Sequence, residues 1–142
     1  MIEFNYETDF ELTNPVDTSN WIIYVIKEEG FKLGDINYIF CDDDYLLKLN
    51  VEFLNHDTLT DIISFDNTLG KLVNGDIFIS IDRVQDNART FDTSFINELH
   101  RVMIHGVLHY LGFKDKTDIE SRIMREQEDI AIKLFNEFHV EQ

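Results

Sequence analysis

The chain has 142 residues, 44% of them hydrophobic and 12 of them Phe, so it is long enough for one domain with a substantial buried core. Its single cysteine, Cys41, excludes a disulfide framework, and the formal net charge of −16 argues against general affinity for nucleic acids. No apolar run approaches the roughly 18 residues of a membrane span and the N-terminus lacks the features of a signal peptide, so we expect one cytoplasmic domain over residues 1–142 with no membrane partner.

The first half of the chain alternates predicted strands and helices. Alternating apolar side chains indicate strands, and apolar residues three or four apart indicate helices. Acidic residues suit the positive end of a helix dipole. The predicted elements are a strand over Ile2–Tyr6, a turn and cap over Pro15–Ser19, a short helix from Trp21 to Gly30, a strand over Ile36–Cys41, and a helix that opens at Asp42–Asp44 and runs through Phe53.

The second half begins with two strands that a turn separates, which predicts a hairpin. Three helices follow, the last of them opened by a capping box. These elements are a strand over Asp61–Phe65, a turn over Asp66–Gly70, a strand over Leu72–Ser80, a helix over Asp82–Thr90, a helix capped by Asp92 or Thr93 that runs to about Gly112, and a long helix after Thr117–Glu120 that carries Ile123, Ile130, Ile132, Leu134 and Phe135. Mixed strands and helices of this kind predict an α+β fold with a small mixed sheet.

Two histidines near the C-terminal end of a predicted helix, His105 and His109, are the main chemical signal of the sequence. Residues four apart lie on one helix face, where two imidazoles can bind one metal ion. Gly112 favours a helix end, because a left-handed residue costs glycine nothing, and the chain can then turn back to present Asp115 as a third ligand. Three protein ligands with an open position are typical of a catalytic metal site.

Simpler interpretations exist for each of these residues. The two histidines could be partly exposed polar residues of an amphipathic helix, and Asp115 could be an ordinary loop carboxylate. The helix is predicted to be buried, however, and an unpaired buried imidazole costs about 1–3 kcal/mol, which a shared metal ion would offset. The other histidines, at positions 56, 100 and 139, lack metal-ligand spacing. Gly106 stands where an HExxH metalloprotease carries its catalytic Glu, so that design is disfavoured.

Several blocks of the sequence, in order and at the proper spacing, carry a resemblance to a known family. The blocks are His105–Gly112, Leu49–Asn50 followed by Thr60–Phe65, Gly75–Ser80, and Glu120, Met124 and Glu126 in the terminal helix. Together they resemble the YbeY family of bacterial endoribonucleases and rRNA maturation factors, over roughly residues 36 to 130.

The resemblance implies an α+β fold with a mixed four-stranded sheet, packed here by about five helices, and a metal site on a central helix. It implies one zinc ion per chain, held by His105, His109 and Asp115, with another divalent transition metal as the alternative. It also implies hydrolysis of single-stranded RNA, linked to 16S rRNA maturation and ribosome quality control. The RNA would lie along the Asp61–Phe65 strand and the metal helix, with Asp61 and Ser64 in the substrate cleft.

Two positions depart from the family pattern. Asp115 stands where the family usually has a third His, so the net charge of the metal site is lower by one. The bound water should then be less acidic, and a harder metal becomes more acceptable. Leu54 stands where the family usually has an Arg that helps the RNA chemistry. Arg101, one turn before His105, is our candidate for the missing phosphate contact, and the alternative is a surface arginine or one that pairs two helices.

The mechanism that we expect is metal-assisted hydrolysis, in which the ion polarises a phosphoryl oxygen and activates a water molecule. Residues 100–126 carry five basic and four acidic side chains, so a polyanionic substrate would approach there. Because the whole chain is strongly acidic, free RNA should bind weakly, and productive action should require the small ribosomal subunit or a protein partner.

Three alternative functions remain at this point. A metallopeptidase-like hydrolase shares the helical histidine pair but not the Glu. A ferrous oxygenase also uses two His and one carboxylate, although such sites commonly lie in folds with more strands. A non-catalytic ribosome assembly factor could hold the same metal for structure alone.

Overall fold

The computed structural model describes residues 1–56 and 58–140, in which four strands and five helices follow one another along the chain. The strands are β1 (Ile2–Tyr6), β2 (Lys32–Cys41), β3 (Ile62–Asp66) and β4 (Leu72–Ser80). The helices are α1 (Pro15–Glu28), α2 (Asp43–Leu54), α3 (Ile81–Thr90), α4 (Phe95–Tyr110) and α5 (Asp118–Val140). The predicted α+β class is therefore confirmed. Within the described ranges, each helix is too short or too polar to cross a membrane.

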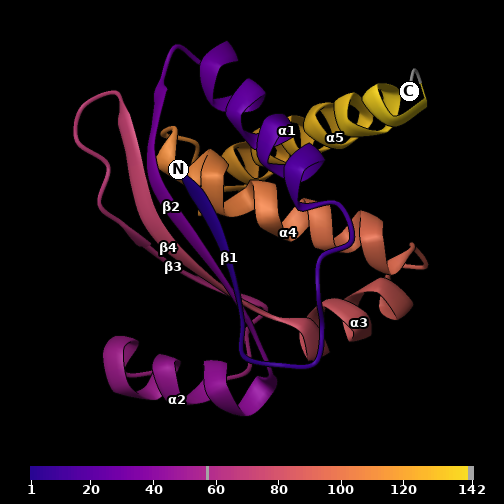
Figure 1. The fold of residues 1–142 in the computed structure, drawn as a ribbon. Helices are drawn as coiled ribbons and strands as arrows, with labels where there is room; N and C mark the ends of the chain where they lie inside the picture. Colours follow the sequence, from indigo (N-terminus) through magenta and orange to yellow (C-terminus); the bar gives the residue numbers. More distant parts are fainter. Residues whose placement is uncertain (57, 141–142) are drawn as a thin grey trace.

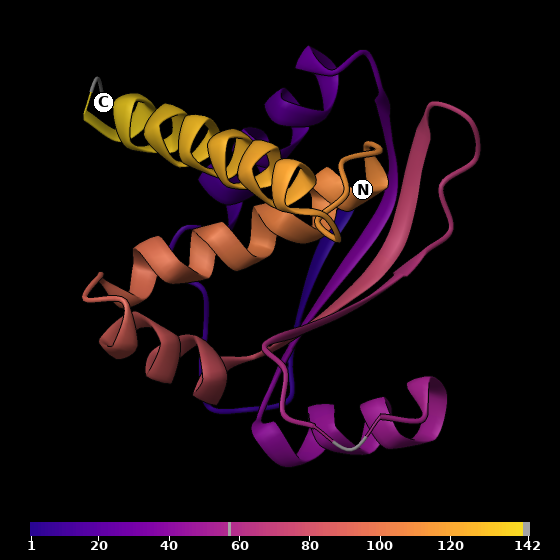
Figure 2. The same ribbon diagram turned by 180° about the vertical axis from the view of Figure 1, so that it is seen from behind.

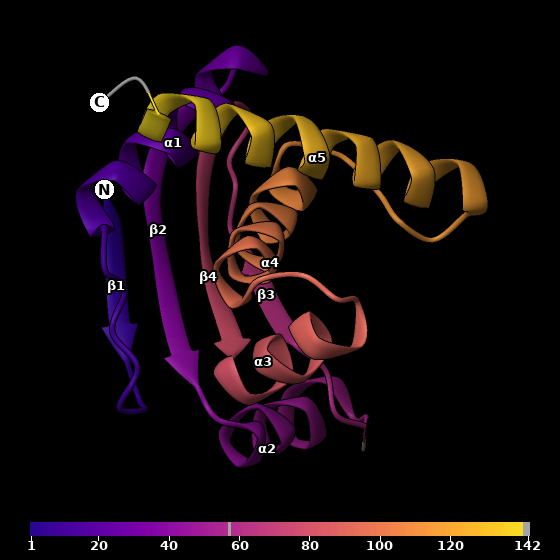
Figure 3. The same cartoon turned by 90° about the vertical axis from the view of Figure 1, so that its right-hand side faces the viewer.

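The strands form one mixed sheet in the order β1-β2-β4-β3, as Figure 3 shows. Both β1 and β4 run parallel to β2, with Ile2 opposite Ile36 and Tyr38 opposite Ile77. Strand β3 runs antiparallel to β4, with Ser64 opposite Ile77, so the predicted hairpin is confirmed. This order makes β3 an edge strand and places the segment that begins at Asp61 next to the histidine helix α4.

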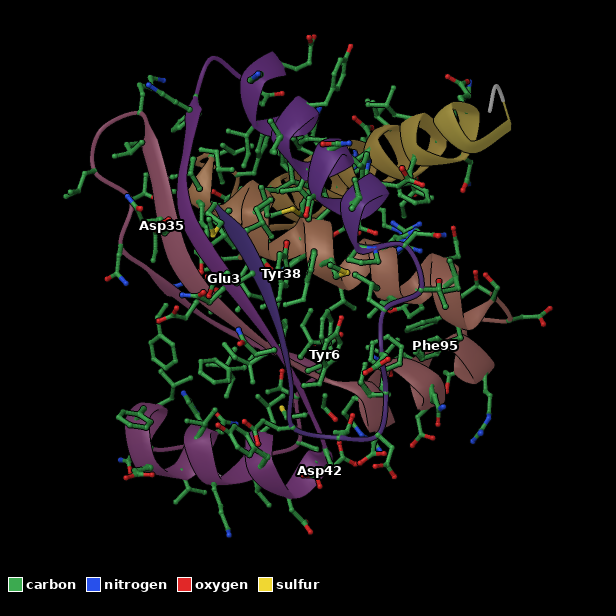
Figure 4. All side chains as sticks on the ribbon, in the orientation of Figure 1. Glu3, Tyr6, Asp35, Tyr38, Asp42 and Phe95 are labelled. Carbon is green, nitrogen blue, oxygen red and sulfur yellow. The ribbon has the colours of Figure 1, made fainter. Side chains whose placement is uncertain are left out.

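One face of the sheet carries the main hydrophobic core beneath α1, α4 and α5 (Figure 1). Neighbouring residues of a strand point to opposite faces, so only alternate residues of the central strands enter this core. The Tyr38 hydroxyl donates a hydrogen bond to the main-chain carbonyl of Met103 at 2.9 Å, and its place between the sheet and α4 can be followed in Figure 4. This bond fixes the middle of α4, two residues before His105, against a central strand.

Helix α2 packs across one end of the opposite face, which is clearest from behind in Figure 2. A small second cluster lies between them, built on the buried residues Cys41, Leu46 and Ile63. Its outer wall is aromatic, because the rings of Tyr45 and Phe78 stack with their centroids 6.3 Å apart. The histidine helix and the end of α2 therefore lie on different faces of the sheet.

Helix α1 and strand β2 begin earlier than the sequence predicts, whereas β1 has the predicted bounds. Residues Pro15–Ser19, predicted as a turn and cap, form the first turns of α1, because proline suits the first position of a helix. Strand β2 begins at Lys32 rather than Ile36, and a register shift between Leu33 and Ile36 breaks the alternation that would have revealed it. An irregular strand of this kind has no uniform period of two.

The caps of the last two helices were predicted with mixed success. Ser94, rather than Asp92 or Thr93, caps α4, because its hydroxyl accepts a hydrogen bond from the Asn97 N–H. The capping box of α5 is confirmed, since Thr117 and Glu120 exchange hydrogen bonds of 3.0 and 3.1 Å between main chain and side chain. Ser94 therefore sets where the histidine helix starts, and Thr117 sets where the helix that packs against it starts.

Candidate metal centre

Helix α4 lies directly against the hairpin strands because a glycine faces them. A Cβ atom at Gly106 would lie 3.0 Å from Cδ1 of Ile77 and 3.2 Å from Cδ1 of Ile62. A side chain at this position would therefore require Ile77 and Ile62 to shift by a few tenths of an ångström. The position where a metalloprotease would carry Glu serves here for close packing, beside His105.

A tight turn ends α4 and brings the third candidate ligand back to the histidines. Gly112 adopts a φ of 101°, a conformation that favours glycine. The Phe113 N–H donates to the Leu108 carbonyl at 3.0 Å, which closes the helix. The chain then reverses and places the Asp115 carboxylate beside both imidazoles, as the glycine signal predicted.

Three potential ligand atoms converge at this turn. Nε2 of His105 and Nε2 of His109 are 3.0 Å apart, and Oδ2 of Asp115 lies 3.2 Å from the first and 3.3 Å from the second. Ligand atoms bound at about 2.0–2.2 Å to a tetrahedral zinc ion are separated by about 3.3–3.6 Å. The observed triangle is close to that size, and the three residues form a group that could hold a metal ion.

Hydrogen bonds on the far side of each ring decide which nitrogen faces the centre. Nδ1 of His105 lies 2.7 Å from a carboxylate oxygen of Glu128, and Nδ1 of His109 lies 3.0 Å from the carbonyl oxygen of Phe113. Both partners are acceptors, so both rings carry a proton on Nδ1 and expose a lone pair on Nε2. Two lone pairs and a carboxylate oxygen then face one another, an arrangement that a bound cation would stabilise. The residues present therefore fit a metal ion.

The partner of His105 comes from the terminal helix. Glu128 on α5 has a relative exposure of 5%, and its other oxygen accepts a hydrogen bond from Arg101 at 2.9 Å. Burial by itself would lower the pKa of His105, but the hydrogen bond and negative charge of Glu128, together with the charges of Asp115 and Asp61, outweigh burial and raise this pKa. Glu128 therefore orients His105 and favours a cation at Nε2 of this ring, either a proton in the metal-free protein or a bound metal ion.

Sequence reasoning missed Glu128, although a signal was present. Met124, Glu128, Ala131 and Phe135 recur at helical spacing and are all buried, so a carboxylate occupies the apolar stripe of α5. Two of the residues predicted to carry the apolar face of this helix, Ile123 and Ile130, are exposed instead. An acidic residue inside an apolar stripe is the feature that would have identified a buried partner.

Arg101 pairs α4 with α5, the role that the sequence left as the alternative. Its guanidinium donates to Glu128 and, at 2.7 Å, to Asp129. The same side chain lines the hollow next to the histidines, so contact between Arg101 and phosphate stays a prediction.

Two hollows of about 480 and 460 Å³ flank the histidine centre and share four lining residues. These shared residues are His105, Asp115, Arg125 and Glu128. The second hollow is also lined by Asp61, which the sequence placed in a substrate cleft, and by Glu98, which it did not single out. Burial raises the pKa of both the Asp61 and the Glu98 carboxyl groups. Ser64 lies further along β3, where its side chain contacts Tyr110.

The remaining histidines lie away from this centre. His100 is buried between aromatic rings, with centroids 5.2 Å from Trp21 and 4.2 Å from Phe135. His56 is exposed just beyond the end of α2. The side chain of His139 is outside the described residues. For His56 and His100, the expectation of ordinary polar positions stays a prediction.

Comparisons with known proteins cover the whole fold, including the histidine centre. The family model described as Endoribonuclease YbeY matches residues 4–136. A protein named Endoribonuclease YbeY from Flavobacterium johnsoniae is 57% identical over 142 residues, which is 100% of both chains. A protein of the same name from Christiangramia forsetii is 56% identical and covers 99% of this chain and 96% of its own. The solution structure of TM1509 from Thermotoga maritima is similar, with a TM-score of 0.73, 26% identity, and coverage of 99% of this chain and 93% of that one.

Proposed function

Because the chain belongs to the YbeY family of endoribonucleases, we propose that it is a zinc-dependent enzyme that cuts single-stranded RNA in 16S rRNA maturation and ribosome quality control. Family membership makes it a hydrolase of RNA phosphodiester bonds with a part in rRNA maturation, and so disfavours the peptidase and oxygenase alternatives. The observation that carries the metal-dependent part is the convergence of three ligand atoms within 3.0–3.3 Å.

His105, His109 and Asp115 are the residues that would hold the ion. A bound zinc ion would supply Lewis acidity, which lowers the pKa of the attacking water and withdraws charge from the phosphodiester. The carboxylate of Asp115 lowers the net charge of the ligand set relative to three imidazoles, and it makes a harder divalent metal an acceptable substitute. Zinc remains our first choice because two imidazoles and one carboxylate are common zinc ligands.

Residues around the ligands orient them and can move a proton. Glu128 holds the His105 ring and the carbonyl of Phe113 holds the His109 ring, so both rings expose Nε2 to the centre. Asp61 lies in the adjoining hollow, and its main-chain carbonyl is bound by the Ser80 N–H at 2.9 Å, which anchors it at the start of β3. We assign Asp61 as the group that accepts a proton from the attacking water, because its raised pKa brings it closer to neutral pH.

Arginines at the hollows are our candidates for contact with the phosphate backbone. Arg125 is exposed and lines both hollows, and Arg122 lines one of them. Arg101 lines the second hollow but is held by two carboxylates, so it would contact phosphate as part of that network. Leu54, at the end of α2, provides no cation in place of the family Arg. Guanidinium groups suit this role because they pair with phosphate oxygens through two hydrogen bonds.

The negative charge of the protein favours RNA that another particle already holds in place. At −16, the chain repels free polyanions, so free RNA should bind weakly, and the binding that does occur should depend strongly on salt. We therefore propose that the small ribosomal subunit, or a protein partner in the cytoplasm, positions the RNA at the centre. Equal cleavage of naked and ribosome-bound RNA would count against this part of the proposal.

The first experiment measures zinc by elemental mass spectrometry on untagged protein, together with cleavage of a labelled single-stranded RNA. Wild type is compared with His109→Ala, and His56→Ala serves as a matched control outside the centre. We expect about one zinc per chain in wild type and in the control, and loss of zinc and cleavage in His109→Ala. A wild-type protein that stays metal-free after zinc is supplied would refute the zinc-dependent mechanism.

The same samples separate the enzyme from an assembly factor that uses its metal only for structure. Two results together would favour the assembly factor. Wild type would bind zinc without cleaving RNA, and folded His109→Ala protein would bind the small ribosomal subunit as well as wild type does. Cleavage by wild type that a chelator stops and zinc restores would favour the nuclease.

A further inference from the structure

A large aromatic ring stands open to solvent at the edge of the hollow beside the histidine centre. Phe91 is 60% exposed and lines the same hollow as His105 and Asp61. Isolated apolar side chains are common on protein surfaces, but this ring shares a concave site with the candidate catalytic groups. Its position suggests a ligand with an apolar face.

The turn that carries Phe91 is well held. Phe91 follows the last residue of α3, and its N–H donates to the Asn87 carbonyl at 2.9 Å. Thr93, two residues after Phe91, is held as well, because its N–H donates to the Ala88 carbonyl at 2.9 Å. The ring is therefore presented from a fixed backbone, so that binding has to order little of the main chain.

The charges of the hollow indicate that contacts with the bases of the RNA have to supply part of the binding affinity. Four carboxylates line it, from Asp61, Glu98, Asp115 and Glu128, but only two guanidiniums, from Arg101 and Arg125. Attraction to phosphate is therefore weak for an RNA enzyme. Proteins that bind single strands obtain much of their affinity from aromatic side chains on which bases stack.

We propose that Phe91 stacks on an unpaired nucleobase of the RNA strand next to the bond that is cut, an inference that rests on the proposed endoribonuclease function. Asn87 and Thr60 line the hollow with Phe91 and can meet the polar edge of that base. The Asn87 amide nitrogen already donates to Asp61 at 3.4 Å, which leaves its carbonyl oxygen to accept from a base amino group. A base within a duplex hides its faces, so this contact selects single strands.

Binding is tested with a fluorescein-labelled ten-nucleotide RNA and the same strand with abasic sites, by anisotropy at low salt with a chelator present to prevent cleavage. Phe91→Leu keeps an apolar side chain but removes the ring, and it should weaken binding of the normal strand by about 5- to 100-fold. Binding of the abasic strand should not change. Phe53→Leu is the matched control, because Phe53 is also 60% exposed but lies on α2, against the other face of the sheet.

A tryptophan variant adds a direct signal of stacking. The single native Trp21 is buried, so Phe91→Trp introduces an exposed emitter. We expect this variant to bind at least as tightly as wild type, with its emission quenched by the normal strand and unaffected by the abasic one. Equal loss of affinity for both strands, no loss in Phe91→Leu, or a failure of wild type to distinguish the strands would overturn the proposal.

Cleavage with zinc, measured in parallel, separates this inference from the function on which it rests. If wild type cleaves the strand and Phe91→Leu cleaves it with the same KM, the stacking proposal is refuted but the endoribonuclease function is not. Wild type that neither binds nor cleaves the strand overturns both. A raised KM with an unchanged kcat in Phe91→Leu supports a base contact that holds the substrate.

Discussion

Glu128→Gln should weaken zinc binding although Glu128 is not itself a ligand. The change keeps the shape of the side chain but replaces two acceptor oxygens with one oxygen and one amide group. Both partners of Glu128 are donors, the Nδ1–H of His105 at 2.7 Å and the guanidinium of Arg101 at 2.9 Å. The amide of Gln can satisfy only one of them. If it turns its NH₂ to His105, the ring proton moves to Nε2 and the lone pair for the metal is lost.

The expected loss of zinc affinity in Glu128→Gln follows from comparable changes at other metal sites. Removing the outer partner of a metal-binding histidine reduces metal affinity by about 10- to 100-fold, or about 1.4–2.8 kcal/mol. The metal-free protein should also lose about 1–3 kcal/mol of unfolding free energy, since a buried charge-assisted hydrogen bond is broken. Arg101 keeps Asp129 as a partner, so a larger loss is not expected.

Zinc affinity is measured by competition with a chromogenic chelator, and stability by urea unfolding of metal-free protein. Asp129→Asn is the matched control, because Asp129 binds Arg101 but not His105. It should lower stability modestly and leave zinc affinity within about twofold of wild type. Zinc affinity unchanged in Glu128→Gln would refute the orienting role. An equal loss of affinity in both variants would show that the effect passes through helix packing instead.

Four further substitutions test other parts of the structure. His109→Ala and Asp115→Ala should each remove the single zinc from the protein, and zinc retained by Asp115→Ala would exclude that carboxylate as a ligand. The folded chain raises the pKa of His105, so it binds this proton more tightly than the unfolded chain does. In metal-free protein, the contribution of this proton to the unfolding free energy is fully present below about pH 6.5 and is lost as pH rises through the pKa of His105 in the folded chain. The unfolding free energies measured at pH 5.5 and pH 8.5 should therefore differ more in wild type than in His105→Gln. Gly75→Ala would place a Cβ 2.5 Å from the Tyr110 ring, so it should lower the free energy of unfolding by about 1–3 kcal/mol. A thermal melt with an unchanged Tm would contradict this expectation.

Local patterns in the sequence were sufficient for much of the fold and for the three candidate ligands. The turn between β3 and β4, the capping box of α5 and the end of α4 all depend on residues within a few positions of one another. The spacing of His105 and His109 places both on one helix face, and Gly112 permits the turn that returns Asp115 to them. Where a local period is interrupted, as at the irregular start of β2, the same reasoning failed.

Only the tertiary structure decided what surrounds those ligands. Glu128 of α5 lies 23 residues after His105 in the chain and reaches its ring, and Glu98 in the first turn of α4 lines the same hollow. Arg101, which the sequence offered for phosphate, is held by two carboxylates of α5. Helical periodicity specifies which residues share a face, but the crossing of α4 and α5 depends on how the side chains of both helices pack. The sequence by itself therefore pointed to three candidate metal ligands, and the packing of helices on the sheet determined their partners and the hollow beside them.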